Sequence, residues 1–327
     1  MTRIVVLATG GTIASRFSQH HGAVIAGVSA EELVRGIEGF APSVEIVAEQ
    51  FCNVGSFLFT LDLAFGIVLR VDELLKNADV AGVVVTCGTD TMEEIAYLAD
   101  LVVASEKPVV FTGAQRHAGY PDSDGPRNLN AAILVAASEA AKGLGALIVF
   151  EDEIHAARDA TKVHASRVGT FASGEHGKLG EVDGSEVIVS RRTVRRRAIP
   201  TDAIEARIDL VKLCMGADGR FIDYVAETGS KGIVIEAFGR GNATLAVTEA
   251  VRRAADRGLV VAVSSRSPQG RIAPTYTGGG GGHDLMNAGA LFVGDLSGVK
   301  TRILLAVLLG AGQSKAQIKE TVARHAD

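Results

Sequence analysis

The chain has 327 residues, of which 47% are hydrophobic and 22% charged, with 38 glycines, no tryptophan and a net charge of −5. This composition is typical of an α/β protein with a large core and many tight loops, in one large or two ordinary domains. The acidic balance argues against a nucleic-acid partner, and because no apolar run approaches about 20 residues we expect no membrane span. Three scattered cysteines indicate reduced core thiols rather than a disulfide framework or a metal site.

The first predicted element is a buried strand over residues 3–7, a short β-branched run. No signal-peptide pattern precedes it, so we expect a cytoplasmic protein. The strand leads into Ala-Thr-Gly-Gly-Thr-Ile-Ala at residues 8–14, where two glycines allow a tight turn with uncovered N–H groups. Thr12 then offers a hydroxyl at the carboxyl end of the strand, where open α/β sheets bind ligands. By itself the pattern fits either a ligand site or an ordinary turn.

The polar stretch over residues 16–27 is expected to be a mobile loop, and its adjacent His20 and His21 are expected to face solvent rather than a metal. Ser29 is a natural N-cap for a short helix. The pattern then predicts two longer elements, a strand over residues 44–51 and a helix over residues 61–77.

A second stretch repeats the arrangement of the first. A buried strand over residues 81–86 feeds the sequence Cys-Gly-Thr-Asp-Thr-Met-Glu-Glu, so that a glycine turn again delivers a threonine, Thr89, now beside the carboxylate of Asp90. Thr91 followed by Glu94 predicts a capping-box start for a helix that continues to about residue 105. Two hydroxyls at two strand ends, with a carboxylate beside one of them, favour acyl-transfer chemistry.

Strands and helices continue to alternate up to residue 190. The sequence predicts a strand over residues 108–112, a helix over residues 126–141 and a strand over residues 146–150. Alternation at these lengths indicates a mostly parallel, doubly wound sheet with right-handed crossovers.

The basic run over residues 190–197 marks a change in composition. It favours either a solvated linker or an anionic partner, and the acidic chain as a whole favours the linker. We therefore predict a larger N-terminal domain, a linker and a smaller C-terminal α/β domain, over residues 1–190, 191–207 and 208–327.

The second predicted domain is a smaller set of strands and helices. Its predicted elements are strands over residues 232–237 and 259–264 and helices over residues 243–256, 299–310 and 314–325. The five-glycine run at residues 278–282 lacks the spacing of a phosphate-binding loop, so we expect a flexible loop near a site or an interface.

Several motifs together resemble the bacterial-type L-asparaginase family over nearly the whole chain. They are the two threonine motifs, Asp-Ala-Thr-Lys at residues 159–162, and supporting segments at residues 113–116, 124–129 and 239–242. The resemblance implies a flavodoxin-like second domain, hydrolysis of the side-chain amide of L-asparagine through a threonine acyl-enzyme, and no cofactor. Besides this small-molecule substrate, it implies a homo-oligomer, a tetramer built as a dimer of intimate dimers.

The resemblance also assigns catalytic roles to the matching residues. Thr12 is the implied nucleophile, and Thr89, Asp90 and Lys162 form a second polar group across the substrate. A threonine hydroxyl needs a neighbouring base to become a good nucleophile. Lys162 would act as that base or tune it.

Further matching residues would bind the substrate. Backbone N–H groups around Gly11 and Gly88 would stabilise the oxyanion that forms during amide hydrolysis. Gly55 and Ser56 match the loop that holds the substrate's α-carboxylate. Asn242 matches a residue that reaches the neighbouring subunit's site.

The chain departs from the family pattern in three places. Residues 13–28 contain no tyrosine, although many members use one there to activate the nucleophile, so Tyr120 or Tyr276 would have to approach instead. Phe57 stands where a glutamine typically contacts the substrate's head group, and it can neither donate nor accept a hydrogen bond. Residues 267–283 contain no acidic residue to match the one that a partner subunit supplies for the α-ammonium group.

Three functions therefore stay open. The first is an L-asparaginase with altered surroundings, and the second is an amidase, esterase or lactonase acting on a small substrate without the α-amino group. The third is a non-catalytic binding protein, against which the retention of both hydroxyls and of Lys162 argues.

Overall fold

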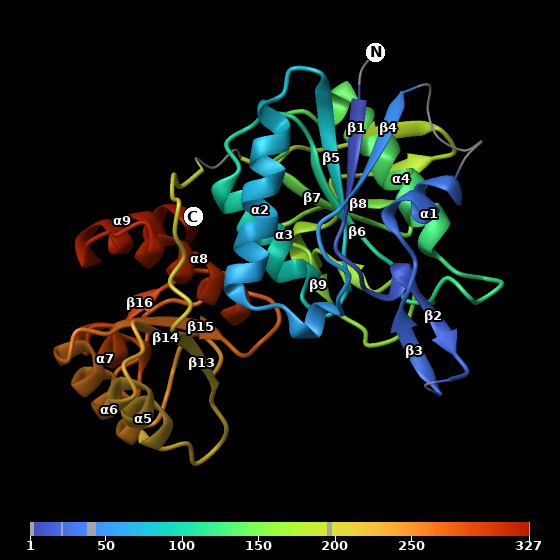
Figure 1. Ribbon diagram of the computed structural model, residues 1–327. Helices are drawn as coiled ribbons and strands as arrows, with labels where there is room; N and C mark the ends of the chain where they lie inside the picture. The colour runs from blue at the N-terminus through green and yellow to red at the C-terminus, as the bar shows by residue number, and fades with distance from the viewer. Residues whose placement is uncertain (1–2, 21, 38–43, 195–197, 327) are drawn as a thin grey trace. The chain divides into compact units, whose positions relative to one another are not determined.

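The computed structural model describes residues 3–20, 22–37, 44–194 and 198–326, and it divides into two compact units, Met1–Ala198 and Ile199–Asp327 (Figure 1). The division falls inside the predicted linker over residues 191–207, part of which lies outside the described residues.

The described part of the first unit contains an eight-stranded sheet in the order β12-β11-β8-β7-β6-β5-β1-β4. Five strands are parallel: β1 (Arg3–Ala8), β4 (Glu45–Gln50), β5 (Val80–Thr86), β6 (Val109–Thr112) and β7 (Ala146–Phe150). Three further strands are antiparallel: β8 (Glu153–Ala156), β11 (Gly180–Asp183) and β12 (Glu186–Val189). The mostly parallel sheet was predicted, whereas the antiparallel strands are too short to give a pattern in the sequence.

Helices cover both faces of this sheet (Figure 1). Helices α1 (Ala30–Arg35) and α4 (Gly125–Ala137) lie on one face, and α2 (Leu61–Lys76) and α3 (Met92–Val102) lie on the other. Ile4 and Val6 of β1 belong to the buried cluster on the α1 and α4 face, as the two-residue repeat of a strand requires. The sheet is therefore doubly wound, as predicted.

Two helix boundaries test the capping predictions. Ser29 caps α1 in a complete capping box with Glu32, which confirms its predicted role. The capping box predicted for Thr91 is wrong, because the Thr91 side chain accepts no hydrogen bond from the first turn of the helix. Its hydroxyl instead donates to the Ser56 carbonyl at 3.0 Å. The helix predicted over residues 126–141 corresponds to α4, which ends at Ala137 and is followed by a 3₁₀ turn, η3 (Glu139–Ala141).

The predicted mobile loop over residues 16–27 contains a β-hairpin, β2 (Ser15–Ser18) and β3 (Ala23–Ala26). Its strands carry Phe17, Val24 and Ile25, residues that favour extended backbone, although all three side chains are exposed. His20 faces solvent as expected, and His21 lies outside the described residues.

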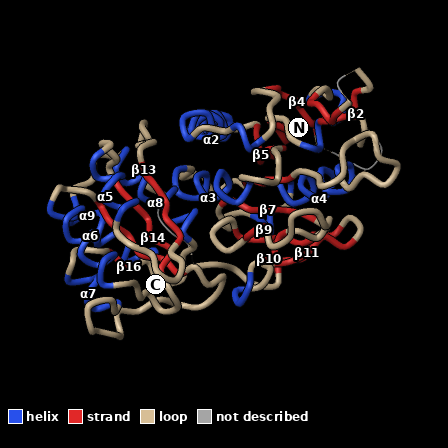
Figure 2. Tube along the Cα trace, turned by 90° about the horizontal axis from the view of Figure 1, so that it is seen from below, coloured by secondary structure: helices blue, strands red, loops and turns tan. Residues whose placement is uncertain are grey.

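A small two-stranded sheet has no strand pairing with the large sheet among the described residues. It pairs β9 (Thr161–Lys162) with β10 (Phe171–Ala172), in the register Phe171↔Lys162, and Figure 2 shows the two strands next to each other. The 3₁₀ turn η4 (Gly174–His176) follows β10.

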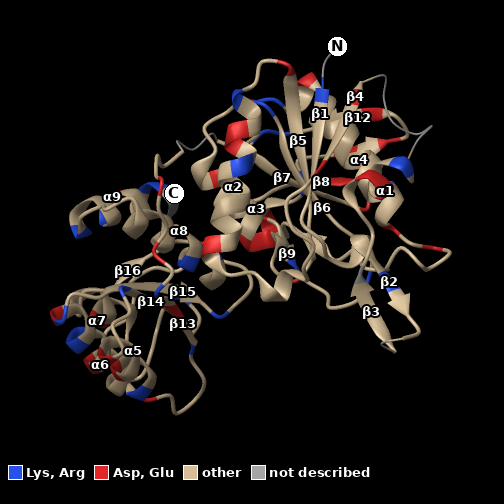
Figure 3. Cartoon of the chain, viewed as in Figure 1, with Lys and Arg blue, Asp and Glu red and all other residues tan. Residues whose placement is uncertain are grey.

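The basic run after residue 190 is attached to the first unit where it is described. The Arg191 Nε donates to the Lys178 carbonyl at 2.9 Å, and the Arg192 guanidinium donates to the Lys142 and Ala140 carbonyls at 3.0 and 2.9 Å. Basic and acidic residues are also interspersed along the helices of both units (Figure 3). These arginines therefore serve the fold, as the linker interpretation expects.

The second unit is built on a parallel sheet that, among the described residues, has four strands in the order β13-β14-β15-β16. The strands are β13 (Ile208–Lys212), β14 (Gly232–Ala237), β15 (Val260–Ser265) and β16 (Leu291–Phe292). The helices are α5 (Arg220–Glu227), α6 (Leu245–Asp256), α7 (Gly282–Asn287), α8 (Gly298–Gly310) and α9 (Lys315–Ala326). The strands lie in chain order, whereas a flavodoxin sheet reverses its order near the first strand.

The five-glycine run is held by hydrogen bonds rather than free. The Asp284 carboxylate accepts from Thr277 Oγ1 at 2.8 Å and from the N–H groups of Gly279 and Gly281 at 2.7 and 3.0 Å. The run is therefore not a free loop, because the Asp284 carboxylate downstream of it accepts from two of its backbone N–H groups.

The cysteines fit the prediction of core thiols only in part. All three are free; Cys87 is buried and Cys52 is half-buried, but Cys214 is exposed. None of the described helices is both long and apolar enough to cross a membrane.

Candidate active site

Four loops meet at the carboxyl edge of the parallel strands. Strands β4, β1, β5 and β6 are neighbours in this order. Their last residues lie opposite one another, in the registers Ala8↔Gln50, Ala8↔Thr86 and Thr86↔Thr112. The loop with Thr12 therefore lies between the loop with Ser56 and the loop with Thr89, and the loop with Gln115 follows. This is the edge at which open α/β sheets bind ligands.

Two glycines allow these loops to touch. A Cβ on Gly11, whose φ is +84°, would lie 2.3 Å from the Gly88 nitrogen, and a Cβ on Gly88 would lie 2.6 Å from Ser56 Oγ. Both distances are far below van der Waals contact. Gly11 is needed because the backbones of the two threonine motifs pack directly against each other, and Gly88 is needed because the Ser56 loop packs against it.

The second threonine is tightly hydrogen-bonded. Thr89 is 5% exposed, and its Oγ1 accepts from Lys162 Nζ at 2.8 Å and from Gln115 Nε2 at 3.4 Å. Lys162 Nζ also forms an ion pair with Asp90 Oδ1 at 2.8 Å, on the exposed side of the cluster. A hydroxyl oxygen has two lone pairs and one proton, so with both lone pairs used Thr89 has only its proton left to offer a ligand.

The first threonine is in a different situation. Thr12 starts a 3₁₀ turn, η1 (Thr12–Ala14), and its side chain is half-buried. Ser15 Oγ donates to the Gly11 carbonyl at 2.8 Å and so fixes the turn, yet no hydrogen bond between described residues uses the Thr12 hydroxyl. The Thr12 oxygen therefore keeps its lone pairs for a substrate.

Gln115 was not assigned a role from the sequence, although its segment supported the resemblance. Its loop is fixed by Asp124, whose carboxylate accepts from the N–H groups of Gln115 and Arg116 at 2.9 and 2.8 Å. Asn128 Nδ2 in turn donates to Asp124 and to the Gly113 carbonyl at 3.2 and 3.0 Å. The segment at residues 124–129 thus supports the hydrogen bond from Gln115 to Thr89.

The loop with Ser56 is built differently from its neighbours. Ser56 is 2% exposed, and its Oγ is buried with no hydrogen-bond partner among the described residues. An unpaired buried hydroxyl costs about 1–3 kcal/mol, which a ligand's acceptor would remove. Phe57 is 72% exposed, and its ring lies against Gly55, where a Cβ would be 2.5 Å from Phe57 Cε1.

The backbone N–H groups of Gly11 and Gly88 themselves differ in their hydrogen bonding. The Gly11 N–H donates to the Val54 carbonyl at 3.2 Å, so it is not free to bind an oxyanion. No hydrogen bond between described residues uses the Gly88 N–H, which keeps that donor available. Burial raises the pKa of the neighbouring Cys87 thiol far above its ordinary range, so this sulfur stays protonated and is not a competing nucleophile.

Asn242 belongs to the second unit and is not part of the cluster built by the first. Its Oδ1 accepts from the Gly282 N–H at 3.2 Å and so fixes the end of the glycine run. Of the two tyrosines that would replace the missing one, Tyr276 is also in the second unit. Tyr120 stacks on His117, and the adjacent Ala118 N–H donates to the Ser15 carbonyl at 3.0 Å, so this segment joins the turn that holds Thr12.

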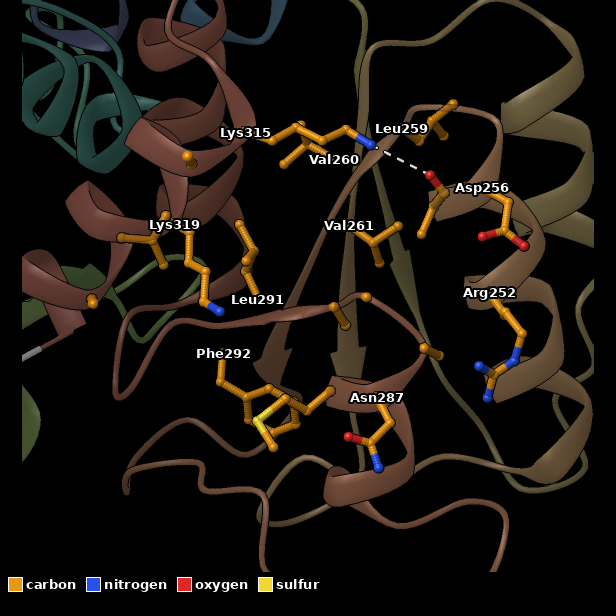
Figure 4. Close-up of a pocket in the computed structure, with 18 residues that line it drawn as sticks. Arg252, Asp256, Leu259, Val260, Val261, Asn287, Leu291, Phe292, Lys315 and Lys319 are labelled. Carbon is orange, nitrogen blue, oxygen red and sulfur yellow. Dashed lines mark hydrogen bonds between the residues drawn. The ribbon is translucent and has the colours of Figure 1, made fainter.

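None of the candidate catalytic residues belongs to a metal-binding cluster or lines the cavity beside β16. Among the described residues, no group of three or more His, Cys, Asp or Glu side chains is placed to hold a metal ion. A cavity of about 610 Å³ lies in the second unit beside β16 (Figure 4). Its walls include Val261, Leu291 and Phe292, and Lys315 donates to the Ala255 carbonyl at 3.3 Å beside it.

Comparison with known proteins agrees with this geometry over both units. The family model for the N-terminal domain of asparaginase matches residues 3–195, and the model described as glutaminase/asparaginase C-terminal domain matches residues 207–322. The chain is 31% identical to an L-asparaginase of Bacillus licheniformis, over 94% of this chain and 96% of the relative. It is 30% identical to L-asparaginase 2 of Escherichia coli strain K12, over 98% of this chain and 92% of the relative. A probable periplasmic L-asparaginase of Haemophilus influenzae is 34% identical, over 94% of this chain and 89% of the relative. With both domain models matched and relatives aligned along nearly the whole chain, this protein belongs to the asparaginase family.

Proposed function

We propose that this chain hydrolyses the side-chain amide of L-asparagine to aspartate and ammonia through an acyl ester on Thr12. The observation that carries the proposal is the placement of two unlike threonines in adjoining loops, one with a free hydroxyl oxygen and one held by Lys162. The names of the relatives supply the substrate, and the chemistry follows from the site.

The reaction needs two steps. In the first, Thr12 Oγ1 attacks the amide carbon, an ester bond forms, and the carbon–nitrogen bond breaks as the nitrogen takes the threonine's proton and leaves as ammonia. In the second, water attacks the ester carbon, aspartate is released, and the Thr12 oxygen recovers a proton. The Thr89 hydroxyl and the Gly88 N–H are the donors available to the substrate while charge develops.

Ser56 supports the binding of a carboxylate. Its buried Oγ has no hydrogen-bond partner among the residues that the structure describes, and Ser56 lies against Gly88, one loop away from Thr12. A substrate carboxylate that accepts from this hydroxyl would anchor the end of the molecule remote from the amide.

A second candidate is hydrolysis of a small amide or ester that lacks the α-amino group. The observation that favours it is Phe57, an exposed ring beside Ser56 that offers no hydrogen bond to an ammonium group. A buried ammonium without a partner is costly, whereas an apolar group would lie against the ring without penalty.

We also propose that the chain forms a homo-oligomer in which Asn242 helps to complete a neighbouring site, and that it works in the cytoplasm. The support for the assembly is the resemblance of residues 239–242 to the family motif. Light scattering on the purified protein would measure its molar mass directly. A mass equal to one 34.0 kDa chain would contradict the assembly.

The function is tested by ammonia release from L-asparagine, L-glutamine and succinamic acid, which lacks the α-amino group. We expect hydrolysis of L-asparagine and its loss in Thr12→Ala. Hydrolysis of succinamic acid alone would support the second candidate. Binding of L-asparagine without ammonia release would support a binding protein and contradict both enzymatic proposals.

A further inference from the structure

The strand that carries Lys162 is short and needs an anchor. β9 and β10 have two residues each and, among the strands that the structure describes, pair only with each other. A two-stranded ribbon of this kind is marginally stable by itself. Yet Lys162 Nζ is held at 2.8 Å from both Thr89 Oγ1 and Asp90 Oδ1. The position of the ammonium group therefore depends on whatever attaches β9 and β10 to the rest of the unit.

Contacts attach β10 to the large sheet on both sides of Ala172. Before it, the Phe171 ring packs on Phe150 of β7, with ring centroids 5.2 Å apart. After it, Ser173 Oγ lies 2.9 Å from Nδ1 of His155 on β8. Ser173 is 4% exposed and His155 is 2% exposed, so water does not replace this hydrogen bond easily.

The Ser173 hydroxyl is diverted from its usual use. Ser173 stands at the N-cap of η4, where a serine side chain ordinarily accepts from the first backbone N–H groups, but it makes no such bond here. The hydroxyl is committed to His155 instead. This hydrogen bond links the end of β10 to β8 of the large sheet.

We propose that His155 is a positioning residue, which holds Lys162 against Thr89 through Ser173 and the β9–β10 pair. The inference rests on the proposed function of Lys162 and Thr89, and it adds a residue to which neither the motifs nor the site geometry gave a role. The path is continuous: β8 holds His155, His155 holds Ser173, and β10 pairs with Lys162.

The protonation state of His155 decides the direction of this hydrogen bond. The groups that face the ring are Glu153 on β8, whose Oε2 is 3.3 Å from Nε2, and Lys178 and Arg191, with Glu181 of β11 bonded to Lys178. Burial lowers the pKa of His155, and Lys178 and Arg191 lower it further, although Glu153 opposes them. The carboxylate beside Nε2 favours the proton there, which leaves Nδ1 to accept from the Ser173 hydroxyl.

Protonation of His155 at acid pH reverses the direction of its hydrogen bond with Ser173. A histidine whose pKa is lowered on folding contributes stability that is present above its unfolded pKa of about 6.5 and is lost as the pH falls through the folded value. A protonated ring also turns Nδ1 into a donor, so the hydrogen bond to Ser173 must re-form with the hydroxyl reversed. The hold on Lys162 then weakens together with the fold around it.

The first experiment compares kcat and KM for the amide substrate in Ser173→Ala, in His155→Leu and in the double variant. A displacement of about 1 Å in a catalytic group can cost about 100-fold in rate, and we expect about a 10-fold or larger loss of kcat with KM changed less than about 3-fold. Because the two residues act through one hydrogen bond, the double variant should lose no more than the worse single variant. Losses that multiply, or a kcat equal to wild type, would overturn the proposal.

A matched control separates positioning from a general loss of packing. Ser264→Ala removes an equally buried hydroxyl, 1% exposed and donating to the Leu296 carbonyl at 2.7 Å, in the second unit. We expect this variant to lose thermal stability comparable to Ser173→Ala but to keep its kcat. A matching fall in kcat would mean that Ser173 acts only through stability.

The pH profile supplies a readout that packing alone would not move. His155→Asn keeps a polar atom near the position of Nδ1 but cannot titrate. It should keep at least about half of kcat near pH 8 and lose the acid limb that His155 imposes on the wild type below its unfolded pKa of about 6.5. An unchanged acid limb would contradict the proposal. If the wild type hydrolyses none of the amides, the proposed function fails instead. A crystal structure of Ser173→Ala then still tests whether Ser173 anchors Lys162. The distance from Lys162 Nζ to Thr89 Oγ1 should lengthen in this variant, and an unchanged distance would overturn the proposal.

Discussion

The two threonine loops of this protein have the same local plan and different surroundings. In each, a buried parallel strand ends in a glycine turn that presents a threonine at the carboxyl edge of the sheet. Thr12 is half-buried, and its hydroxyl has no hydrogen bond among the described residues. Thr89 is 5% exposed and accepts from both Lys162 and Gln115.

This difference teaches that the roles of the two residues follow from hydrogen bonding rather than from the motif. A nucleophile must have a free lone pair aimed at the carbonyl carbon, and Thr12 meets this condition. A hydroxyl whose lone pairs are occupied can only donate, which suits Thr89 to stabilising the substrate oxygen or passing a proton. Lys162 is bonded to Thr89 and not to Thr12, so it acts through the second loop.

Removing Lys162 should give the largest effect among the changes that test this comparison. Lys162→Met deletes the donor to Thr89 and leaves Asp90 unpaired, and we expect kcat to fall by about 1,000-fold with little change in the thermal midpoint. Steady-state kinetics on the preferred amide measures it. Lys76→Met, at a lysine 73% exposed on α2, serves as the control and should be neutral. Comparable loss in both variants would remove Lys162 from the mechanism.

Thr89→Val should cost somewhat less, because it deletes one hydroxyl and preserves the shape of the side chain. We expect about a 100-fold fall in kcat, the usual effect of losing one hydrogen-bond donor in a catalytic site. Thr248→Val removes a similarly buried hydroxyl, 3% exposed, in the second unit and should keep its activity. A complete loss of activity together with retained substrate binding would indicate that Thr89, and not Thr12, forms the ester.

Gly88→Ala tests the close approach of the loops. Its Cβ would lie 2.6 Å from Ser56 Oγ, so the loop with Ser56 must move, and we expect kcat/KM to fall by about 10-fold through KM. Gly27→Ala is the matched control, because its Cβ would meet no atom within 4 Å. Equal kinetics in the two variants would mean that the contact between these loops does not shape the site.

Phe57→Gln should have the smallest effect, and its direction is informative. The exposed ring gives way to a side chain that can hydrogen-bond a substrate ammonium, so KM for L-asparagine should fall about 3-fold while kcat stays the same. The ratio of kcat/KM for L-asparagine to that for succinamic acid reports the change. A rise in KM for L-asparagine would show that the ring itself binds the substrate.

Much of the fold could be predicted from local pattern. Four of the five parallel strands, β1, β5, β6 and β7, are buried runs, and the alternation of strands with helices predicts a doubly wound sheet. The antiparallel strands β8, β11 and β12 are four residues long and were missed; β11 and β12 are only partly buried, and the buried part of β8 includes the polar His155. The hairpin after residue 14 was missed because its polar and glycine content outweighed three residues that favour extended backbone.

The site could be predicted only as far as sequence motifs reach. Thr12, Thr89, Asp90 and Lys162 were named from motifs, and the structure places the last three in one hydrogen-bonded cluster. Gln115 and His155 were not named, because their contacts join residues 26 and 18 positions apart and leave no local pattern. The occupied N–H of Gly11 was likewise invisible, since its partner Val54 belongs to a loop on another strand.

The measurement that tests this account most directly is identification of the acylated residue. The enzyme would be quenched in acid during turnover of a saturating amide, digested and examined by peptide mass spectrometry. We predict that the acyl mass is carried by the peptide containing Thr12 and is absent from Thr12→Ala. An acyl group on the peptide containing Thr89 would contradict the account, because the residue held by Lys162 and Gln115 would then be the nucleophile.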